Sequence, residues 1–505
     1  MKMSKLLLPF LSLTLLLTVG CTKKGTTSSS SSKKIEEDTG EGYSKVDFTK
    51  AEISNIGQTA YQLDGCPSTG EVNFLVLPVE FSDSKAADKG FTTEIINKAF
   101  NGPTDNTFQY YSVGEYFAKS SYGKFTPKFN VLDKWYQPSK PSTYYLDPNN
   151  TTKDFLGEEL ELGDQMVIEE ILTQLDEENF DFTKYDLDQN GCIDGVIVIN
   201  TLEVDPEVTM KWAYQWNNYL LNNAGDDYLY HGSNNDFSLN NYFWGSCDFL
   251  YSHIGEDENG EPVEVYTHDV DPTNTYTFIH ELSHVIGAAD YYDTTYEAYF
   301  YDEDGNPVDM SAMKGCDVMD AYASDHSPFT KFEYGWVTET KWVNTEAKKT
   351  FELRPFESSG DTLVFGNDYD PQKGAFQEYY IVSYYTNTGL NYFEKDGQNT
   401  AGFFSRDGIV IYHVDASYIV EEEEGFNYYY LVYNNDFSYE DYEKGLNTDY
   451  FLLTFVKSQN DTFTYVAGDR MPTNLKDHNG KKLPYSLQCN YVNEEKASVT
   501  LTISK

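Results

Sequence analysis

A short stretch near the middle of the chain, His280–Asp290, constrains the fold more than any other feature. It reads His-Glu-Leu-Ser-His-Val-Ile-Gly-Ala-Ala-Asp. On a helix, His280 and His284 lie one turn apart on the same face. Two imidazoles so placed can bind one zinc ion, with Glu281 beside a metal-bound water as a general base. The alternative, a solvated helix with incidental histidines, is weakened because the whole chain has only 8 histidines.

The residues after this helix offer a third metal ligand. Gly287 suits a helix C-terminus, because a left-handed backbone costs glycine nothing. The chain can then turn sharply and return Asp290, six residues past His284, to the metal. Asp293 is a rival, but three further residues would have to fold back. Glu333 is a more distant rival, on a later predicted helix.

Residues on both sides of this stretch support the same helix. Asp271 and Pro272 are expected to open it, since Asp can cap and Pro tolerates the first helical position. Downstream, Gly-Cys-Asp-Val-Met at 315–319 predicts that Met319 forms an apolar floor under the metal. A plain core methionine is the alternative. Tyr322 is a candidate for stabilising an oxyanion, although an ordinary tyrosine is the default in a chain with 43 of them.

A second oxygen-rich stretch predicts calcium binding. Side chains at alternate positions can curl around one Ca²⁺, as in an EF-hand loop, and a backbone carbonyl adds a ligand. The matching residues are Asp186, Asp188, Asn190, Asp194 and the carbonyl of Cys192. Ile197 stands where the EF-hand has its bidentate Glu, so no helical exit is expected. The alternative is an Asx-rich turn without an ion. Two other acidic turns, 256–260 and 302–306, are expected to be hairpin tips.

Length, charge and cysteines restrict the class of protein. The 505 residues suffice for two domains and a leader. The net charge of −46 argues against binding to nucleic acid or adsorption to anionic lipid. The 6 cysteines include no Cys-x-x-Cys pair, so they do not indicate a zinc knuckle. Cys66 could in principle block zinc as a thiolate, but an ordinary loop cysteine is the preferred interpretation.

The N-terminal residues predict a lipoprotein. Lys2 and Lys5 precede a short apolar run, and Thr-Val-Gly-Cys at 18–21 is similar to a lipobox. We therefore expect a signal peptide at 1–21, lipidation of Cys21, and a Ser-rich tether at 22–45. The alternatives are an ordinary cleaved signal or a membrane anchor. The lipid form would place the protein on the extracellular face of a bacterial membrane.

The remaining chain predicts an α+β fold in two parts. Residues 46–345 carry a buried strand at 74–81, a helix at 112–121 and an amphipathic helix at about 156–175. The expected core face of the last helix comprises Leu160, Val167, Ile168, Ile171 and Leu172. Residues 346–505 alternate or run apolar between Asn, Asp and Gly, which predicts an all-β, sandwich-like domain. His413 lies in one of its strands, where a structural role is favoured over metal binding.

Several of these motifs together resemble the immune inhibitor A family of bacterial zinc peptidases. The resemblance spans about 72–414 and rests on residues 120–124, 181–195, 211–216, 280–293, 317–319, 334–336 and 408–413. The His-Glu-x-x-His-x-x-Gly-x-x-Asp pattern is similar to the extended metzincin motif, with Asp where His is more usual. The resemblance implies a metzincin-like catalytic domain with an active-site helix and a mixed sheet. It also implies that His280, His284 and Asp290 bind zinc and that Glu281 is catalytic. The chain departs from the family at Tyr214, where a His would be expected.

The resemblance implies a secreted, surface-anchored zinc-dependent endopeptidase that hydrolyses peptide bonds of extracellular proteins. We expect Zn²⁺ and Ca²⁺ as cofactors, protein or peptide substrates, and a monomer. Membrane contact is expected only through the N-terminal lipid. One alternative is a surface adhesin that retains the zinc fold without catalysis, against which the intact Glu281 argues. Another is a zinc hydrolase of glycopeptide or cell-wall amides.

Overall fold

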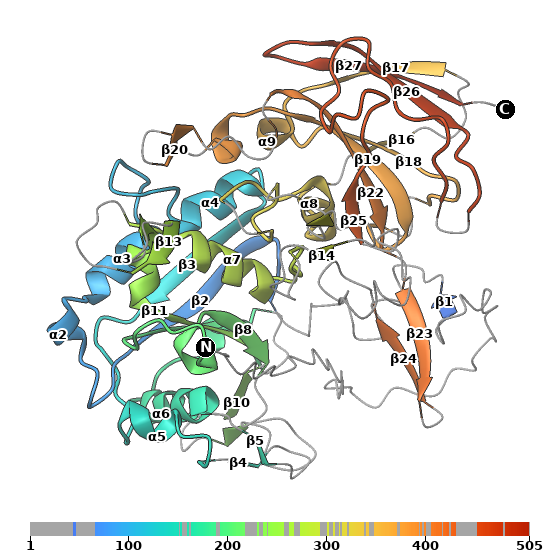
Figure 1. Ribbon diagram of the computed structural model, residues 1–505. Helices are drawn as coiled ribbons and strands as arrows, with labels where there is room; N and C mark the ends of the chain where they lie inside the picture. Colours follow the sequence, from blue (N-terminus) through green and yellow to red (C-terminus); the bar gives the residue numbers. More distant parts are fainter. Residues whose placement is uncertain are drawn as a thin grey trace.

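The structure is a computed structural model, and its architecture is α+β (Figure 1). It describes residues 44–46, 66–150, 152–153, 159–160, 163–187, 192–217, 230–231, 236–239, 241–256, 262–266, 273–292, 300–301, 307–308, 313, 316–320, 323–337, 340–342, 348–370, 374–392, 394–395, 398–399, 404, 406–416, 418–423, 426–430, 452–477 and 480–503. The predicted leader at 1–21, including Cys21, lies outside these residues. Of the predicted tether, only its last two residues are described, in strand β1 (Ser44–Val46).

A five-stranded mixed sheet forms the centre of the N-terminal half. Its order is β3-β2-β7-β11-β8. The strands are β2 (Gly70–Val79), β3 (Phe125–Val131), β7 (Val196–Asn200), β8 (Tyr214–Asn217) and β11 (Asn241–Ser246). The first four in this order pair in parallel, and β8 pairs antiparallel to β11 at one edge. The strand predicted at 74–81 corresponds to the second half of β2, which begins at Gly70 and already ends at Val79.

Helices cover both faces of this sheet, because successive strand residues point to opposite sides. In β2, Phe74 and Val76 pack with helices α3 (Thr93–Asn101), α4 (Val113–Ser120) and α7 (Tyr276–Val285). Leu75 and Leu77 pack on the other side against α6 (Gly163–Glu177). Both faces of the sheet are therefore buried, which is why the sequences of its central strands are continuous runs of apolar residues.

Both helices predicted for the N-terminal half are present, but one of them starts later than predicted. The helix predicted at 112–121 is α4, with Ser112 and Ser121 at its ends. The helix predicted from about 156 begins only at Gly163, and Leu160 lies in the short strand β5 (Glu159–Leu160) instead of on the helix core face. A Cβ at position 163 would lie 2.1 Å from the carbonyl oxygen of Tyr145, so glycine is needed where the chain enters α6.

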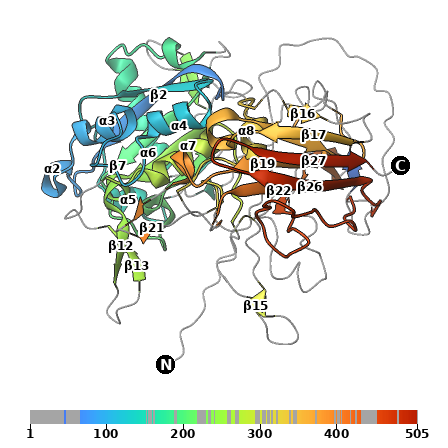
Figure 2. The same ribbon diagram turned by 90° about the horizontal axis from the view of Figure 1, so that it is seen from above.

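Two sheets pack face to face in the C-terminal half (Figure 2). One has the order β16-β18-β19-β22-β25, with β16 (Thr340–Trp342), β18 (Thr362–Phe365), β19 (Glu378–Tyr385), β22 (Gly408–Asp415) and β25 (Leu453–Phe455). The other has the order β17-β27-β26, with β17 (Lys348–Leu353), β26 (Tyr485–Val492) and β27 (Ala497–Ile503). The second face of the first sheet, with Tyr379, Ile381 and Tyr412, joins the same core cluster as Met319.

The remaining described elements are short. They are α2 (Ala86–Lys89), α5 (Ser142–Tyr145), β4 (Thr152–Lys153), η1 (Thr183–Tyr185), β6 (Cys192–Ile193), η2 (Thr209–Lys211), β9 (Tyr230–His231), β10 (Asp236–Leu239), η3 (Cys247–Tyr251), β12 (His253–Glu256), β13 (Pro262–Val265), β14 (Phe300–Tyr301), β15 (Pro307–Val308), α8 (Pro328–Glu333), α9 (Phe356–Ser359), η4 (Gly389–Asn391), β20 (Glu394–Lys395), β21 (Gln398–Asn399), β23 (Tyr418–Glu423) and β24 (Phe426–Tyr430). The pairs β12–β13 and β14–β15 are antiparallel, as expected for the two predicted hairpins. Within the described ranges, no helix has the length and apolar character needed to cross a membrane.

Candidate metal centre

Helix α7 places the two histidines. It begins at Tyr276, later than the predicted opening by Asp271 and Pro272, which lie outside the described residues. The Asn274 side chain accepts a hydrogen bond from the backbone N–H of Tyr276 at 2.9 Å and so satisfies a free donor of the first turn. Phe278, Ile279, Leu282 and Val285 are buried against the central sheet. This apolar face anchors the helix and fixes where its histidines point.

Gly287 reverses the chain directly after α7. Its φ of 116° lies in the region that favours glycine. The N–H of Gly287 donates to the His284 carbonyl at 2.9 Å, and the N–H of Ala288 donates to the Ser283 carbonyl at 2.9 Å. These bonds close the helix end and return Asp290 toward the helix, as the sequence predicts.

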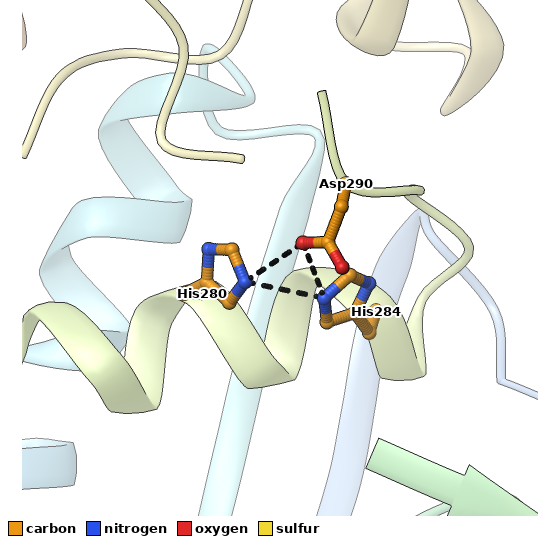
Figure 3. Close-up of side chains that lie close together, drawn as sticks. All are labelled: His280, His284 and Asp290. Atoms are coloured by element: carbon orange, nitrogen blue, oxygen red, sulfur yellow. Dashed lines mark hydrogen bonds and ion pairs between the residues drawn. The ribbon is translucent and has the colours of Figure 1, made fainter. Parts of the chain in front are cut away.

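His280, His284 and Asp290 converge on one point (Figure 3). Asp290 Oδ1 lies 3.1 Å from His280 Nε2 and 3.2 Å from His284 Nε2. The two Nε2 atoms are 3.2 Å apart. Tetrahedral zinc with bonds of about 2.0–2.1 Å places its donors roughly 3.3–3.4 Å apart. The three donors therefore fit a metal of this size, and they are the one such group of His, Cys, Asp or Glu side chains within the described residues.

Backbone carbonyls hold both imidazoles in the orientation that metal binding needs. His280 Nδ1 lies 2.9 Å from the Val318 carbonyl, and His284 Nδ1 lies 2.8 Å from the Ala288 carbonyl. A carbonyl oxygen only accepts, so each Nδ1 carries a proton and each Nε2 is free to bind a metal. Bonds of this kind fix the ring and its tautomer in metal sites.

In the triad, the charges of neighbouring side chains and burial shift the pKa values in opposite directions. Burial alone would lower the pKa of both histidines, but Asp290 raises the pKa of His280, and it raises the pKa of His284 to about 9. Burial alone would raise the pKa of Asp290, but His284 and His280 hold it well below its usual range. Asp290 is thus an anionic donor. Without a metal, this cluster retains a proton that binding would release.

Glu281 lies beside this triad and is only 7% exposed. Burial raises the pKa of its carboxyl group, although His280 and His284 oppose the shift. The backbone N–H of Gln215, in edge strand β8, faces this carboxylate and counters the rise of its pKa. In an antiparallel strand, the N–H and C=O of one residue point to the same edge. The Gln215 carbonyl therefore faces the same side as Glu281.

The segment at 317–319, where the sequence predicts an apolar floor under the metal, shares one buried cluster with α7. Met319 is fully buried, and its carbonyl accepts a hydrogen bond from the Tyr291 N–H at 2.9 Å. Asp317 accepts the Met319 N–H at 2.9 Å and is itself fully buried. Sequence reasoning missed that the Val318 carbonyl orients His280. Backbone acceptors leave no pattern in the side-chain sequence, so no signal pointed to it.

The other predicted site residues lie elsewhere or outside the described residues. Tyr322 and Asp293 are outside them. Glu333 does not belong to the triad, and burial, with the charge of Asp317, raises its pKa to about 8. Tyr214 donates from its hydroxyl to the buried carboxylate of Asp164 at 2.8 Å, so it joins β8 to α6.

The predicted calcium loop is described only at its ends. Asp188 and Asn190 lie outside the described residues, and Cys192 opens strand β6. Asp194 is 1% exposed, and its Oδ2 accepts the Leu187 N–H at 2.8 Å. This bond fits an Asx-stabilised turn with or without an ion. Calcium binding here therefore stays a prediction.

His413 and the cysteines have structural surroundings. His413 Nε2 lies 2.8 Å from Glu378 Oε1, and the ring stacks on Tyr380 with centroids 4.6 Å apart. Four cysteines are free thiols and buried: Cys66, Cys247, Cys316 and Cys489. Burial, with the charge of Asp194, raises the pKa of Cys66 well above its ordinary value, which disfavours a zinc-binding thiolate.

No protein-family model and no curated protein sequence matches this chain. The chemistry of the site is therefore interpreted from its geometry.

Proposed function

We propose that the chain is a zinc-dependent endopeptidase with a metzincin-like catalytic domain. The observation that carries this proposal is the convergence of three donors within 3.1–3.2 Å of one another, with a buried carboxylate from the same helix beside them. Two imidazoles favour zinc or a similar transition metal over calcium or magnesium, which prefer oxygen ligands. With three protein ligands, a fourth position remains for water or substrate.

Glu281 is the proposed catalytic residue. A zinc ion held by the triad would act as a Lewis acid on a water molecule and on the scissile carbonyl. The Glu281 carboxylate would serve as general base towards the attacking water and then as general acid towards the leaving amine. Burial raises the pKa of Glu281, which favours its holding a proton, and the Gln215 N–H faces its carboxylate. Asp290 makes the donor set more anionic than three histidines, so a bound zinc would acidify a water less and would leave more of the deprotonation to Glu281.

Edge strand β8 supports a peptide as substrate. It pairs with β11 on one side, with Gln215 opposite Phe243. The backbone groups of Gln215 point to the other side, next to Glu281. An extended peptide can add to such an edge through main-chain hydrogen bonds. This arrangement brings the peptide backbone beside the proposed general base.

The test is the variant Glu281→Gln. Gln keeps the shape of the side chain but cannot take a proton, so peptide cleavage should fall by at least about 10²-fold. The purified variant should still contain one zinc ion per chain and unfold like the wild type. Casein turnover and metal content measure both properties. Cleavage at the wild-type rate would disprove the role of Glu281.

Two alternatives give different results in the same assays. A surface adhesin that retains the zinc fold would bind zinc but show no turnover by the wild-type protein. A zinc hydrolase of glycopeptide or cell-wall amides would spare casein and release fragments from cell-wall material. Lipid anchoring on the extracellular face of a bacterial membrane, calcium binding and a monomeric state complete the proposal.

A further inference from the structure

A buried histidine outside the metal triad, His326, lies between the two segments that orient His280. Its side chain is fully buried, and the rings of Tyr116, Tyr334 and Trp336 lie 5.5–5.6 Å from it. Its Nε2 lies 3.2 Å from Ser283 Oγ, on α7. Its Nδ1 lies 3.6 Å from Asp317 Oδ1, in the segment that carries Val318.

The hydrogen bonds of Ser283 define the proton on one ring nitrogen. Ser283 Oγ lies 2.8 Å from the Ile279 carbonyl, which can only accept. The single hydroxyl proton of Ser283 is used in that bond. His326 Nε2 must therefore donate to Ser283 Oγ, so this bond joins His326 to the helix turn between the two metal-binding histidines.

Asp317, on the other side of the ring, connects the 317–319 segment to the residue after His326. Its carboxylate accepts the N–H of Met319 at 2.9 Å and the N–H of Ser327 at 2.7 Å. The second of these bonds joins the 317–319 segment to the residue that follows His326, and the His326 ring lies against Asp317, with Nδ1 at 3.6 Å from Oδ1.

His280 depends on both segments that His326 connects. Its backbone belongs to α7, whereas its Nδ1 donates to the Val318 carbonyl at 2.9 Å. A shift of the Val318 segment against α7 would rotate the His280 ring and move Nε2 from the other donors. The contact of His326 with Ser283 on one side and Asp317 on the other opposes such a shift.

We propose that His326 is a positioning residue that sets the metal-binding geometry of His280 by tying α7 to the 317–319 segment. The inference rests on the proposed metal centre, but it concerns metal binding and not peptide cleavage. Residues that orient metal ligands commonly change metal affinity by about 10–100-fold when replaced. Neither the spacing of the histidine motif nor the triad geometry alone assigns this role.

The test compares His326→Phe and Ser283→Ala with a matched control, His413→Phe. All three substitutions remove a hydrogen bond from a buried or half-buried site. His413, in β22, pairs with Glu378, in β19, and neither residue belongs to the triad. Zinc affinity is measured by chelator competition, and the Co²⁺-loaded protein gives an absorption spectrum that reports ligand geometry. Unfolding of the metal-free proteins by urea measures stability separately.

His326→Phe should weaken zinc binding about 10-fold or more and shift the Co²⁺ spectrum. Ser283→Ala should weaken binding in the same direction, and the double variant should be no worse than His326→Phe, because both changes break one link. His413→Phe should lower stability without changing zinc affinity or the spectrum.

Unchanged zinc affinity and an unchanged Co²⁺ spectrum in His326→Phe would reduce His326 to a structural residue and overturn the proposal. If His326→Phe does not fold, Ser283→Ala decides alone, and wild-type metal binding in that variant would overturn it. If the wild-type protein binds zinc but cleaves no peptide, the proposed endopeptidase activity is contradicted, but the test of His326 remains valid. A wild-type protein that binds neither metal would overturn both.

Discussion

At the scale of single residues, Asp290 is assigned as the third metal donor, and this assignment can be tested directly. Asp290 lies 3.1–3.2 Å from both histidine donors, and its pKa is held well below the usual range by their charge. Asp290→Ala should therefore lose at least about 10-fold in zinc affinity, and peptide cleavage should fall with it. Asp293→Ala and Glu333→Ala should keep stoichiometric zinc. Metal content of the three purified variants decides. A zinc-replete Asp290→Ala protein, with loss in either rival, would contradict the assignment.

Glu333 gives a prediction about pH and stability. Burial raises its folded-state pKa to about 8 from an ordinary value of 4.5. The folded protein therefore holds this proton more tightly than the unfolded chain, and the resulting stability is lost as pH rises from about 4.5 to 8. Glu333→Gln cannot ionise, so it avoids this loss of stability. The difference in unfolding free energy, variant minus wild type, should therefore be larger at pH 8 than at pH 5 by at least about 1 kcal/mol. Urea unfolding at both values measures this, and a constant difference would contradict it.

At the scale of elements, the oxygen-rich loop before β7 offers a test of calcium binding. Asp194 already closes the chain onto Leu187, so an ion would add to an existing turn. If calcium binds the folded loop, it should raise the melting temperature, because a ligand specific for the native state stabilises it by mass action. Asp188→Ala should abolish that rise. An absent calcium response in the wild type would favour the Asx-rich turn.

The elements also indicate how far the sequence predicts the site. The spacing of His280, His284 and Asp290 predicted the triad because one helix and one turn determine it. Local patterns also predicted α4 and most of β2. The predicted start of α6 was wrong because Glu159 and Leu160 pair with β4 in a short antiparallel ladder, so the helix begins only at Gly163.

The residues that hold the donors could not be predicted from the sequence. The Val318 carbonyl is 38 positions from His280, and its hydrogen bond exists only because tertiary packing brings the two segments together. His326 gave no signal for the same reason, since its partners Ser283 and Asp317 are on different elements. The contact of Gln215 with Glu281 depends on the edge position of β8 in the sheet.

At the scale of the whole molecule, one of the two C-terminal sheets contributes to the core cluster that includes α7 and the 317–319 segment. Tyr379 and Ile381 on β19 and Tyr412 on β22 share one buried cluster with Val318 and Met319. The same sheet packs on its other face against β17, β26 and β27. This core includes residues from both halves of the chain and contains Val318 and Met319 of the 317–319 segment. The predicted boundary at 345–346 stays a prediction, but the packing couples the stability of the two halves.

The remaining prediction concerns how the molecule is attached to the cell. The apolar run ending in Gly20-Cys21, followed by a Ser-rich stretch, predicts a diacylglycerol on Cys21 and a tether that holds the folded part away from the membrane. Cys21→Ser should therefore move the protein from the membrane fraction to the soluble fraction. Its peptide cleavage should be unchanged, because the triad and Glu281 are far from this position in sequence. Mass spectrometry of the native N-terminus identifies the modification. A native terminus at another residue, or an unmodified Cys21, would contradict the lipid anchor and leave the metal centre unaffected.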